Sequence, residues 1–183
     1  KDHITFLNAL TLLKEKIKFE AIIMGRGRLK KKIFHFIETN NLKKNVRILD
    51  YKKNPYPYIK QADFLILTSL HEGLPNILLE AIVLSKFIIS SNCPTGPKEI
   101  LDNGNGGELF KVGNYKDLAQ SLSKFRINPG NVGRGNRREQ GFFWKYQVQA
   151  QCRTDAQKKS DRQGRAARNK EARYSAKEIL IWF

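Results

Sequence analysis

The chain has 183 residues and carries 34 Lys and Arg against 17 Asp and Glu, a net charge of +17 at pH 7. This length fits one domain of ordinary size, or a domain with a tail. Hydrophobic residues make up 40% of the chain, which excludes a wholly disordered protein. No apolar run approaches the roughly 18 residues that a membrane-spanning helix needs. Two distant cysteines, Cys93 and Cys152, argue against a disulfide framework or a zinc site and favour a reducing compartment.

The composition changes near Phe125. Residues 1–124 hold 20 basic and 12 acidic side chains, and only three of the bases are arginine. Residues 125–183 hold 14 basic and 5 acidic side chains with nine arginines, and leucine nearly disappears. We therefore predict a folded domain over 1–124 and a basic tail over 125–183 that is largely disordered, because it has little apolar area to offset its conformational entropy.

Apolar periodicity in the first part predicts helices and strands in alternation. Phe6, Leu10, Leu13 and Ile17 have the spacing of one helix stripe, and Leu29, Ile33 and Ile37 that of another. The expected strands are 19–24, 46–49, 63–67, 87–90 and 108–110. The expected helices, after the first, lie within 29–37, 56–60, 76–84, 97–101 and 116–124.

This alternation indicates an α/β fold, a Rossmann-like parallel sheet with helices on both faces. Ligands of such sheets bind beyond the carboxyl ends of the strands, where loops lead into helix N-termini. The loops that meet this description are 25–28, 69–76 and 92–98, which are all rich in Gly, Pro or small polar residues.

The most informative stretch is 69–81. Pro75 suits the first turn of a helix, and the free N–H groups after it, with the helix dipole, would suit a phosphate. Glu80 stands among aliphatic residues, so its carboxylate needs partners. It could simply cap a neighbouring loop or pair with a lysine. A hydrolytic pair with Glu72 is disfavoured, because eight helical residues would separate the two by ~12 Å, beyond the roughly 5 to 9.5 Å such pairs use.

A set of motifs in 1–124 resembles the nucleotide-sugar-binding, C-terminal half of family 4 retaining glycosyltransferases of the GT-B fold. Each motif is weak alone, but their order is specific. The motifs are Lys1-Asp2-His3, Gly25-x-Gly27, Asn54-Pro55-Tyr56-Pro57-Tyr58, Ala62-Asp63-Phe64, Ser69, Glu72-Gly73-x-Pro75-Asn76, Glu80-Ala81, Gly96-Pro97-Lys98-Glu99-Ile100 and Gly106-Gly107-Glu108-Leu109-Phe110-x-Val112-Gly113. The Asn-Pro-Tyr-Pro-Tyr stretch looks most like bacterial enzymes that build capsule, O-antigen or glycan-lipid chains from UDP-hexoses or UDP-N-acetylhexosamines.

The resemblance implies a role for particular side chains. Glu72 would contact hydroxyls of the donor sugar near the reacting carbon, and Glu80 would accept hydrogen bonds from the ribose hydroxyls. Lys1 would stabilise the leaving diphosphate in place of a metal, so no metal or cofactor is expected. The remaining contacts to the nucleotide sugar are expected from the main-chain amides of Asn76, Ile77 and Leu78, close approach at Gly25 and Gly27, and Leu49 at a strand end beside the base.

The chain also departs from the family pattern. The strand expected before Lys1, which would carry the family's diphosphate-binding arginine, is missing, as is the N-terminal domain that would bind a glycan or lipid-linked acceptor. Since the first residue is Lys1 rather than Met, we expect a donor-binding fragment, inactive alone, with unpaired sheet edges. We expect it in the cytoplasm. Lysine clusters at 30–32 and 43–44 would suit solvent or the anionic inner face of the plasma membrane.

The tail supports a rival hypothesis, a nucleic-acid-binding module formed by residues 126–183. Its arginines are interleaved with the aromatic cluster 142–146, a combination that binds single strands by stacking and phosphate contact. Disorder, an insertion or a frameshift would account for the same composition. Residues 172–179 resemble the start of the family's closing helix, with Ser175 as a candidate N-cap.

Overall fold

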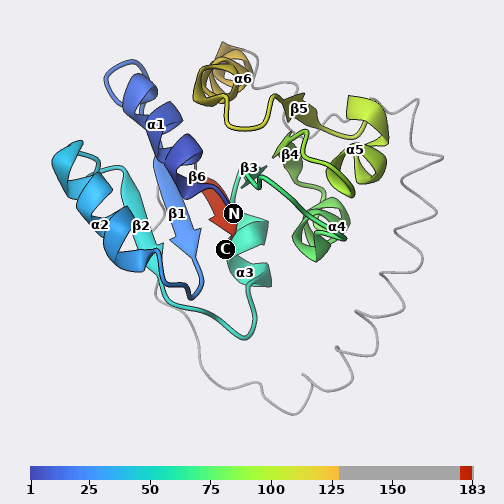
Figure 1. Cartoon of the computed structure of the whole chain (residues 1–183), viewed down its shortest axis with the longest axis horizontal. Coiled ribbons are helices and arrows are strands. Elements are labelled where there is room, and N and C mark those ends of the chain that lie inside the picture. The colour runs from blue at the N-terminus through green and yellow to red at the C-terminus, as the bar shows by residue number, and fades with distance from the viewer. Residues whose placement is uncertain (128–177, 183) are drawn as a thin grey trace. The chain divides into compact units, whose positions relative to one another are not determined.

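The computed structural model describes residues 1–127 and 178–182, all of which belong to one compact unit (Figure 1). A six-stranded, wholly parallel sheet with the order β2-β1-β6-β3-β4-β5 lies at its centre. The predicted α/β class is therefore confirmed.

Helices and strands alternate along residues 1–127 as the apolar pattern predicts. The helices are α1 (His3–Leu13), α2 (Lys30–Thr39), α3 (Tyr56–Gln61), α4 (Asn76–Val83), α5 (Pro97–Ile100), the 3-10 turn η1 (Asp102–Gly104) and α6 (Tyr115–Ile127). The strands are β1 (Glu20–Met24), β2 (Val46–Leu49), β3 (Phe64–Leu67), β4 (Phe87–Ser91), β5 (Glu108–Phe110) and β6 (Glu178–Trp182).

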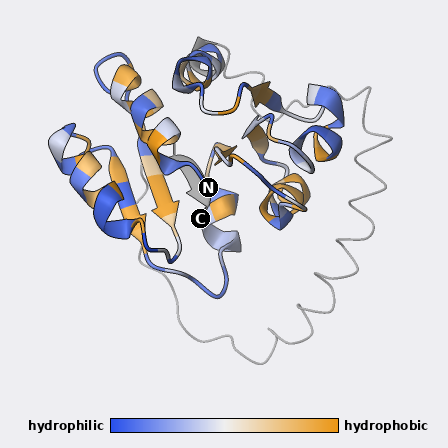
Figure 2. Ribbon diagram, viewed as in Figure 1, coloured by the Kyte–Doolittle hydropathy of each residue, from blue (hydrophilic) through white to orange (hydrophobic). Residues whose placement is uncertain are grey.

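Helices cover both faces of the sheet, and successive strand residues point to opposite faces. On one face Ile23 and Ile66 join a buried cluster with α1, α2 and α6. On the other, Ile22 and Leu65 are buried at the alternate positions, as are inward residues of α3 and α4. Figure 2 shows the result, with hydrophobic strands and a hydrophilic outer side of α2. Burial on both faces explains why the strands have continuous apolar runs rather than alternating ones.

Strand β6 occupies the centre of the sheet. It pairs in parallel with β1, where Ile22 is opposite Leu180, and with β3, where Leu65 is opposite the same residue. The order equals the 3-2-1-4-5-6 order of a doubly wound Rossmann sheet if β6 takes the first strand's place. The expected gap between β1 and β3 is therefore filled, and these strands have no unpaired inner edges.

Two expectations for the end of the chain change accordingly. Residues 172–179 do not all begin a helix, because Glu178 and Ile179 belong to β6; a strand suits this apolar, β-branched run better than a helix turn. The five residues of β6 also differ from the expected disorder of 125–183, and α6 continues to Ile127. For residues 128–177, which lie outside the described part of the chain, disorder stays a prediction.

Helix α4 is less enclosed than its composition predicts. Ile77, Leu78, Ala81 and Ile82 are buried, whereas Glu80 and its neighbour Leu79 are only partly covered. One face of the helix packs on the sheet, and the other is left near the surface. A carboxylate on that second face can therefore meet a ligand.

Candidate functional site

The candidate site lies at the carboxyl ends of β6 and β3. In a doubly wound sheet the crossovers change direction between the first and fourth strands, and a crevice opens there. In this chain β6 and β3 hold those two positions. The loop after β3 contains Ser69 and Glu72, and Lys1 lies two residues before α1. Residues 71 positions apart in the sequence therefore meet near this switch point of the sheet.

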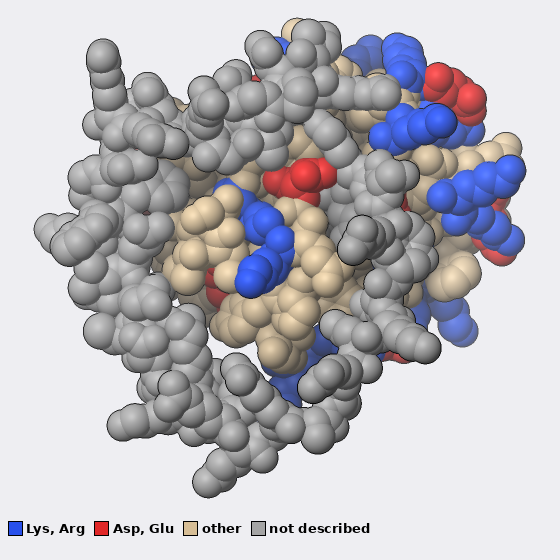
Figure 3. Space-filling view, turned by 180° about the vertical axis from the view of Figure 1, so that it is seen from behind, with Lys and Arg blue, Asp and Glu red and all other residues tan. Residues whose placement is uncertain are grey.

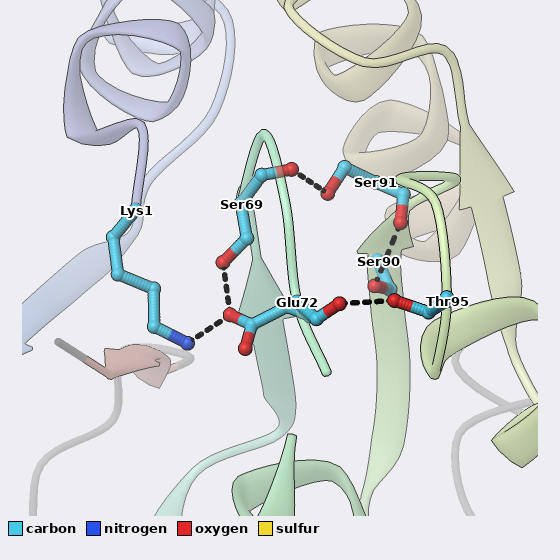
Figure 4. Close-up of polar contacts among 6 residues, drawn as sticks. All are labelled: Lys1, Ser69, Glu72, Ser90, Ser91 and Thr95. Atoms are coloured by element: carbon cyan, nitrogen blue, oxygen red, sulfur yellow. Dashed lines mark hydrogen bonds and ion pairs between the residues drawn. The ribbon is translucent and has the colours of Figure 1, made fainter. Parts of the chain in front are cut away.

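Asp2, next to Lys1 in the chain, caps the first turn of α1. Its carboxylate is the N-cap of α1, accepting hydrogen bonds from the Thr5 backbone N–H at 3.2 Å and from the Thr5 hydroxyl at 2.6 Å. A capped start fixes the direction in which the chain enters the helix. The Lys1 ammonium then donates to Glu72 Oε1 in an ion pair whose side chains are 28% and 14% exposed (Figure 4).

Glu72 receives a second hydrogen bond on the same oxygen. Ser69, which is wholly buried at the end of β3, donates its hydroxyl to Glu72 Oε1 at 2.5 Å. Burial by itself raises the pKa of Glu72, but the hydrogen bonds from Lys1 and Ser69 outweigh it and hold that pKa below its usual value. Glu72 is therefore a carboxylate at neutral pH.

The loop after β4 supports the main chain of Glu72. The Thr95 hydroxyl donates to the Glu72 carbonyl, and the Ser91 hydroxyl donates to the Ser69 carbonyl at 2.6 Å (Figure 4). Gly96 packs so closely that a Cβ there would lie 2.5 Å from the Gly73 carbonyl oxygen. The loops after β3 and β4 therefore form one hydrogen-bonded unit.

The first turn of α4 provides main-chain donors beside this unit. Pro75 precedes the helix, and no side chain caps it. Leu78 already donates its N–H to the Pro75 carbonyl at 2.9 Å. Within residues 1–127 and 178–182, the N–H groups of Asn76 and Ile77 have no hydrogen-bond acceptor. Together with the helix dipole, these two amides make a site that favours an anion.

Glu80 lies one turn further along α4. In the described part of the chain its carboxylate makes neither a hydrogen bond nor an ion pair, and partial burial raises its pKa. Burial raises the pKa of Tyr56 on α3, and the charge of Glu80 raises it further. The capped or lysine-paired Glu80 considered from sequence is not what these residues show. Within residues 1–127 and 178–182, the hydrogen-bonding capacity of this carboxylate is unused.

The other predicted contacts lie at the ends of β1 and β2. Gly25 has φ of 146° and donates its N–H to the Leu49 carbonyl at 3.1 Å, so these two residues are neighbours. Gly27 is exposed in the same loop. Nearby, the Arg26 guanidinium lies 4.7 Å from the Tyr51 ring centroid. Since β6 separates β1 from β3, this loop is about two strand spacings, or ~10 Å, from that of Glu72.

Most of this chain matches a known protein family. Residues 1–140 match the family described as "Glycosyl transferases group 1". The chain belongs to the group 1 glycosyl transferases. The predicted resemblance to GT-B enzymes is thereby confirmed.

Individual relatives and a solved structure agree with this assignment. The glycosyltransferase chain is 45% identical over 80 residues to an uncharacterised glycosyltransferase of Methanocaldococcus jannaschii, covering 44% of this chain and 20% of the relative. It is 30% identical over 122 residues to N-acetylgalactosamine-N,N'-diacetylbacillosaminyl-diphospho-undecaprenol 4-alpha-N-acetylgalactosaminyltransferase of Campylobacter jejuni. That match covers 67% of this chain and 33% of the relative. The crystal structure of a Staphylococcus aureus TarM mutant with UDP has the same fold, with a TM-score of 0.71 and 23% sequence identity. The match covers 82% of this chain and 31% of the TarM chain. The glycosyltransferase chain thus spans a fifth to a third of these relatives.

The structure brings some predicted site residues of this glycosyltransferase together and adds others. Lys1 and Glu72 are in contact, and Gly25 adjoins Leu49, whereas Glu80 makes no hydrogen bond or ion pair with any residue in the described ranges. Sequence reasoning gave no role to Ser91 or Thr95, or to Ser69 within its motif. Only the Ser-x-x-Glu spacing of 69–72 could have signalled one, because a turn brings residues three apart together.

The remaining expectations concern metal binding, membrane spans and nucleic-acid binding. Among residues 1–127 and 178–182, no group of three or more His, Cys, Asp and Glu side chains could hold a metal ion. No helix in those ranges is long and apolar enough to span a bilayer. Metal independence stays a prediction, and so does nucleic-acid binding by residues 126–183, most of which lie outside the described residues.

Proposed function

We propose that this chain is the donor-binding part of a retaining glycosyltransferase. It would transfer a hexose or N-acetylhexosamine from a UDP-sugar to a glycan or lipid-linked acceptor in bacterial surface polysaccharide synthesis. Membership of the group 1 glycosyl transferases supports the reaction class. The UDP bound to the TarM mutant and the diphospho-undecaprenol in the name of the Campylobacter relative support the donor and acceptor classes.

The observation that carries the donor proposal is the carboxylate of Glu80, half-buried and without a partner in the described residues. A group in that state costs free energy unless a ligand supplies donors. Two vicinal hydroxyls, as on ribose, match the two oxygens of one carboxylate. Glu80 lies on the same helix as the uncapped amides of Asn76 and Ile77, so a diphosphate could bind at the start of α4.

Lys1 and Glu72 would act at the bond that breaks. When the anomeric bond cleaves, its electron pair leaves with UDP, and negative charge grows on the diphosphate. A lysine ammonium and the N-terminus of α4 would together stabilise that charge without a metal. Glu72, ionised by its two hydrogen bonds, would hold hydroxyls of the donor sugar. Donor binding would then exchange part of the Lys1–Glu72 ion pair for contacts with the ligand.

Isothermal titration of the full chain with UDP tests the proposal. We expect Glu80→Ala to weaken UDP binding by about 10- to 100-fold, since a hydrogen bond to a charged group contributes about 1.5–3 kcal/mol. Glu15→Ala is the matched control, because Glu15 is 85% exposed at the end of α1. Absence of UDP binding at millimolar concentration, or equal affinities of the Glu80 and Glu15 variants, would contradict the donor site.

The distribution of surface charge supports a location for the protein. Lys and Arg side chains gather over the side where α1 and α2 lie (Figure 3). On α2 the exposed Lys31 and Lys32 accompany Phe34, which is 50% exposed. We place the protein in the cytoplasm, with this face toward anionic lipid. Sedimentation with vesicles of phosphatidylglycerol, compared with phosphatidylcholine alone, tests this, and equal binding to both would refute it. An acceptor-binding domain outside these 183 residues would complete the enzyme.

A further inference from the structure

Ser69 links the sheet to the Glu72 carboxylate. It follows β3, its side chain is wholly buried, and its hydroxyl donates to Glu72 Oε1 at 2.5 Å. Its own carbonyl accepts the hydroxyl hydrogen of Ser91, itself 1% exposed, at 2.6 Å. The position of Ser69 is therefore fixed from a neighbouring strand. Lys1, by contrast, reaches Glu72 with a long side chain that is 28% exposed.

We propose that Ser69 is a positioning residue for the glycosyl transfer. It holds Glu72 by Oε1, with Ser91 as its anchor, and so presents Oε2 to a hydroxyl of the donor sugar. This inference rests on the proposed function and assigns Ser69 a task on the sugar, not on the nucleotide.

The distribution of bonds on Glu72 supports this division of roles. Both Lys1 and Ser69 donate to Oε1, and in the described ranges Oε2 receives no hydrogen bond. When a phosphate competes for Lys1, the Ser69 bond remains and prevents the carboxylate from rotating away. A fixed acceptor loses less entropy on binding a hydroxyl than a free side chain does.

Thr95 restrains the other end of the same residue. Its hydroxyl donates to the Glu72 carbonyl, so both main chain and side chain of Glu72 are held. Thr95 has φ of 59° and is followed by Gly96 with φ of 86°, a tight bend that points the loop after β4 toward Glu72. Ser69 and Thr95 hold Glu72 from the loops after two different strands, which favours a unique orientation of the carboxylate.

The first test needs no ligand. The pKa of Glu72 is measured by carbon-detected NMR titration of the carboxyl group in the full chain and in Ser69→Ala, Ser69→Thr and Ser123→Ala. Ser123 is the matched control, since it also loses one side-chain hydrogen bond but lies on α6. We expect Ser69→Ala to raise the pKa of Glu72, because a bond to the charged form is lost. Ser69→Thr keeps the hydroxyl and should restore the lower value. An unchanged pKa in Ser69→Ala overturns the proposal.

The second test separates sugar from nucleotide. Affinities for UDP, UDP-glucose and UDP-N-acetylglucosamine are compared in the same variants. We expect Ser69→Ala to weaken the UDP-sugar that the wild type prefers by about tenfold, with UDP affinity within about twofold of wild type. In a Glu72→Ala background, Ser69→Ala should cause no further loss. Equal weakening of UDP and UDP-sugar, or an additive loss in the double variant, overturns the proposal.

The two tests also distinguish which idea has failed. If the wild type binds no UDP compound, the proposed function falls, while the NMR titration still decides whether Ser69 holds Glu72. If the wild type binds the donor and Ser69→Ala behaves as wild type in both tests, only the role of Ser69 falls.

Discussion

Gly96 should be the glycine least tolerant of substitution in the site. Its φ of 86° and ψ of −73° fall near the γ-turn conformation with positive φ, which is rare and strained for residues with a Cβ. An added Cβ would also lie 2.5 Å from the Gly73 carbonyl oxygen and 2.6 Å from Pro75 Cδ. Neither atom can move without a substantial free-energy cost, because one is a main-chain atom and the other belongs to a buried ring.

The expected loss of unfolding free energy in Gly96→Ala follows from these two terms. Strain at a sparsely populated backbone conformation costs about 1–3 kcal/mol. Overpacking against atoms that must move costs about 1–3 kcal/mol more. We therefore expect a total of about 4 kcal/mol. Relief of the clash would displace Gly73 and with it Glu72, so UDP-sugar affinity should fall further than UDP affinity.

Two control variants separate the terms, with urea unfolding followed by far-ultraviolet circular dichroism as the assay. Gly113→Ala tests backbone strain alone, because Gly113 has φ of 72° with no atom within 4 Å of the added Cβ. Gly107→Ala tests steric overlap, since its Cβ would lie 2.7 Å from the Ile88 carbonyl oxygen without a positive φ. Gly96→Ala should cost about as much as both together. If it destabilises no more than Gly113→Ala, the close packing of the two loops is wrong.

Three further predictions concern the supports of the site. Asp2→Ala should lower the free energy of unfolding, measured in urea, by about 1 kcal/mol, because α1 loses its N-cap. Asp2→Asn should retain most of the wild-type stability, since asparagine also caps helices. Equal losses of stability in the two variants would contradict the capping role. His3 is buried, which lowers its pKa from 6.5 to about 4, so below pH 6.5 the unfolded chain binds the extra proton. His3 should therefore lower the free energy of unfolding by about 3 kcal/mol as the pH falls from 6.5 to 4, and His3→Gln should not show this loss. Identical pH profiles of stability in the variant and the wild type would refute the prediction. Leu180→Pro should cost about 3 kcal/mol or more by removing a ladder N–H from central β6, whereas Leu180→Val should be mild; a Leu180→Pro chain as stable as wild type would place β6 outside the sheet.

Much of the fold follows from local patterns. The apolar runs and the stripes at helical spacing predict the α-helices and strands of residues 1–127 within a few positions, because each element must bury one stripe or both faces; they do not predict the short 3-10 turn η1. The ordered motifs around Glu72 and Glu80 are also local, and they sufficed to indicate a nucleotide-sugar enzyme. The sequence likewise indicates that Pro75 begins a helix with free amides.

Tertiary structure alone decided which residues meet. The chain between α6 and β6 gives no local sign that residues 178–182 lie between β1 and β3, since parallel pairing depends on partners distant in the sequence. Only the assembled sheet brings together the loops that hold Glu72. Its contacts with Lys1, Ser69 and Thr95 depend on this assembly. Residue types and spacing determine which element each segment forms, but the carboxyl edge of the assembled sheet determines which side chains come into contact.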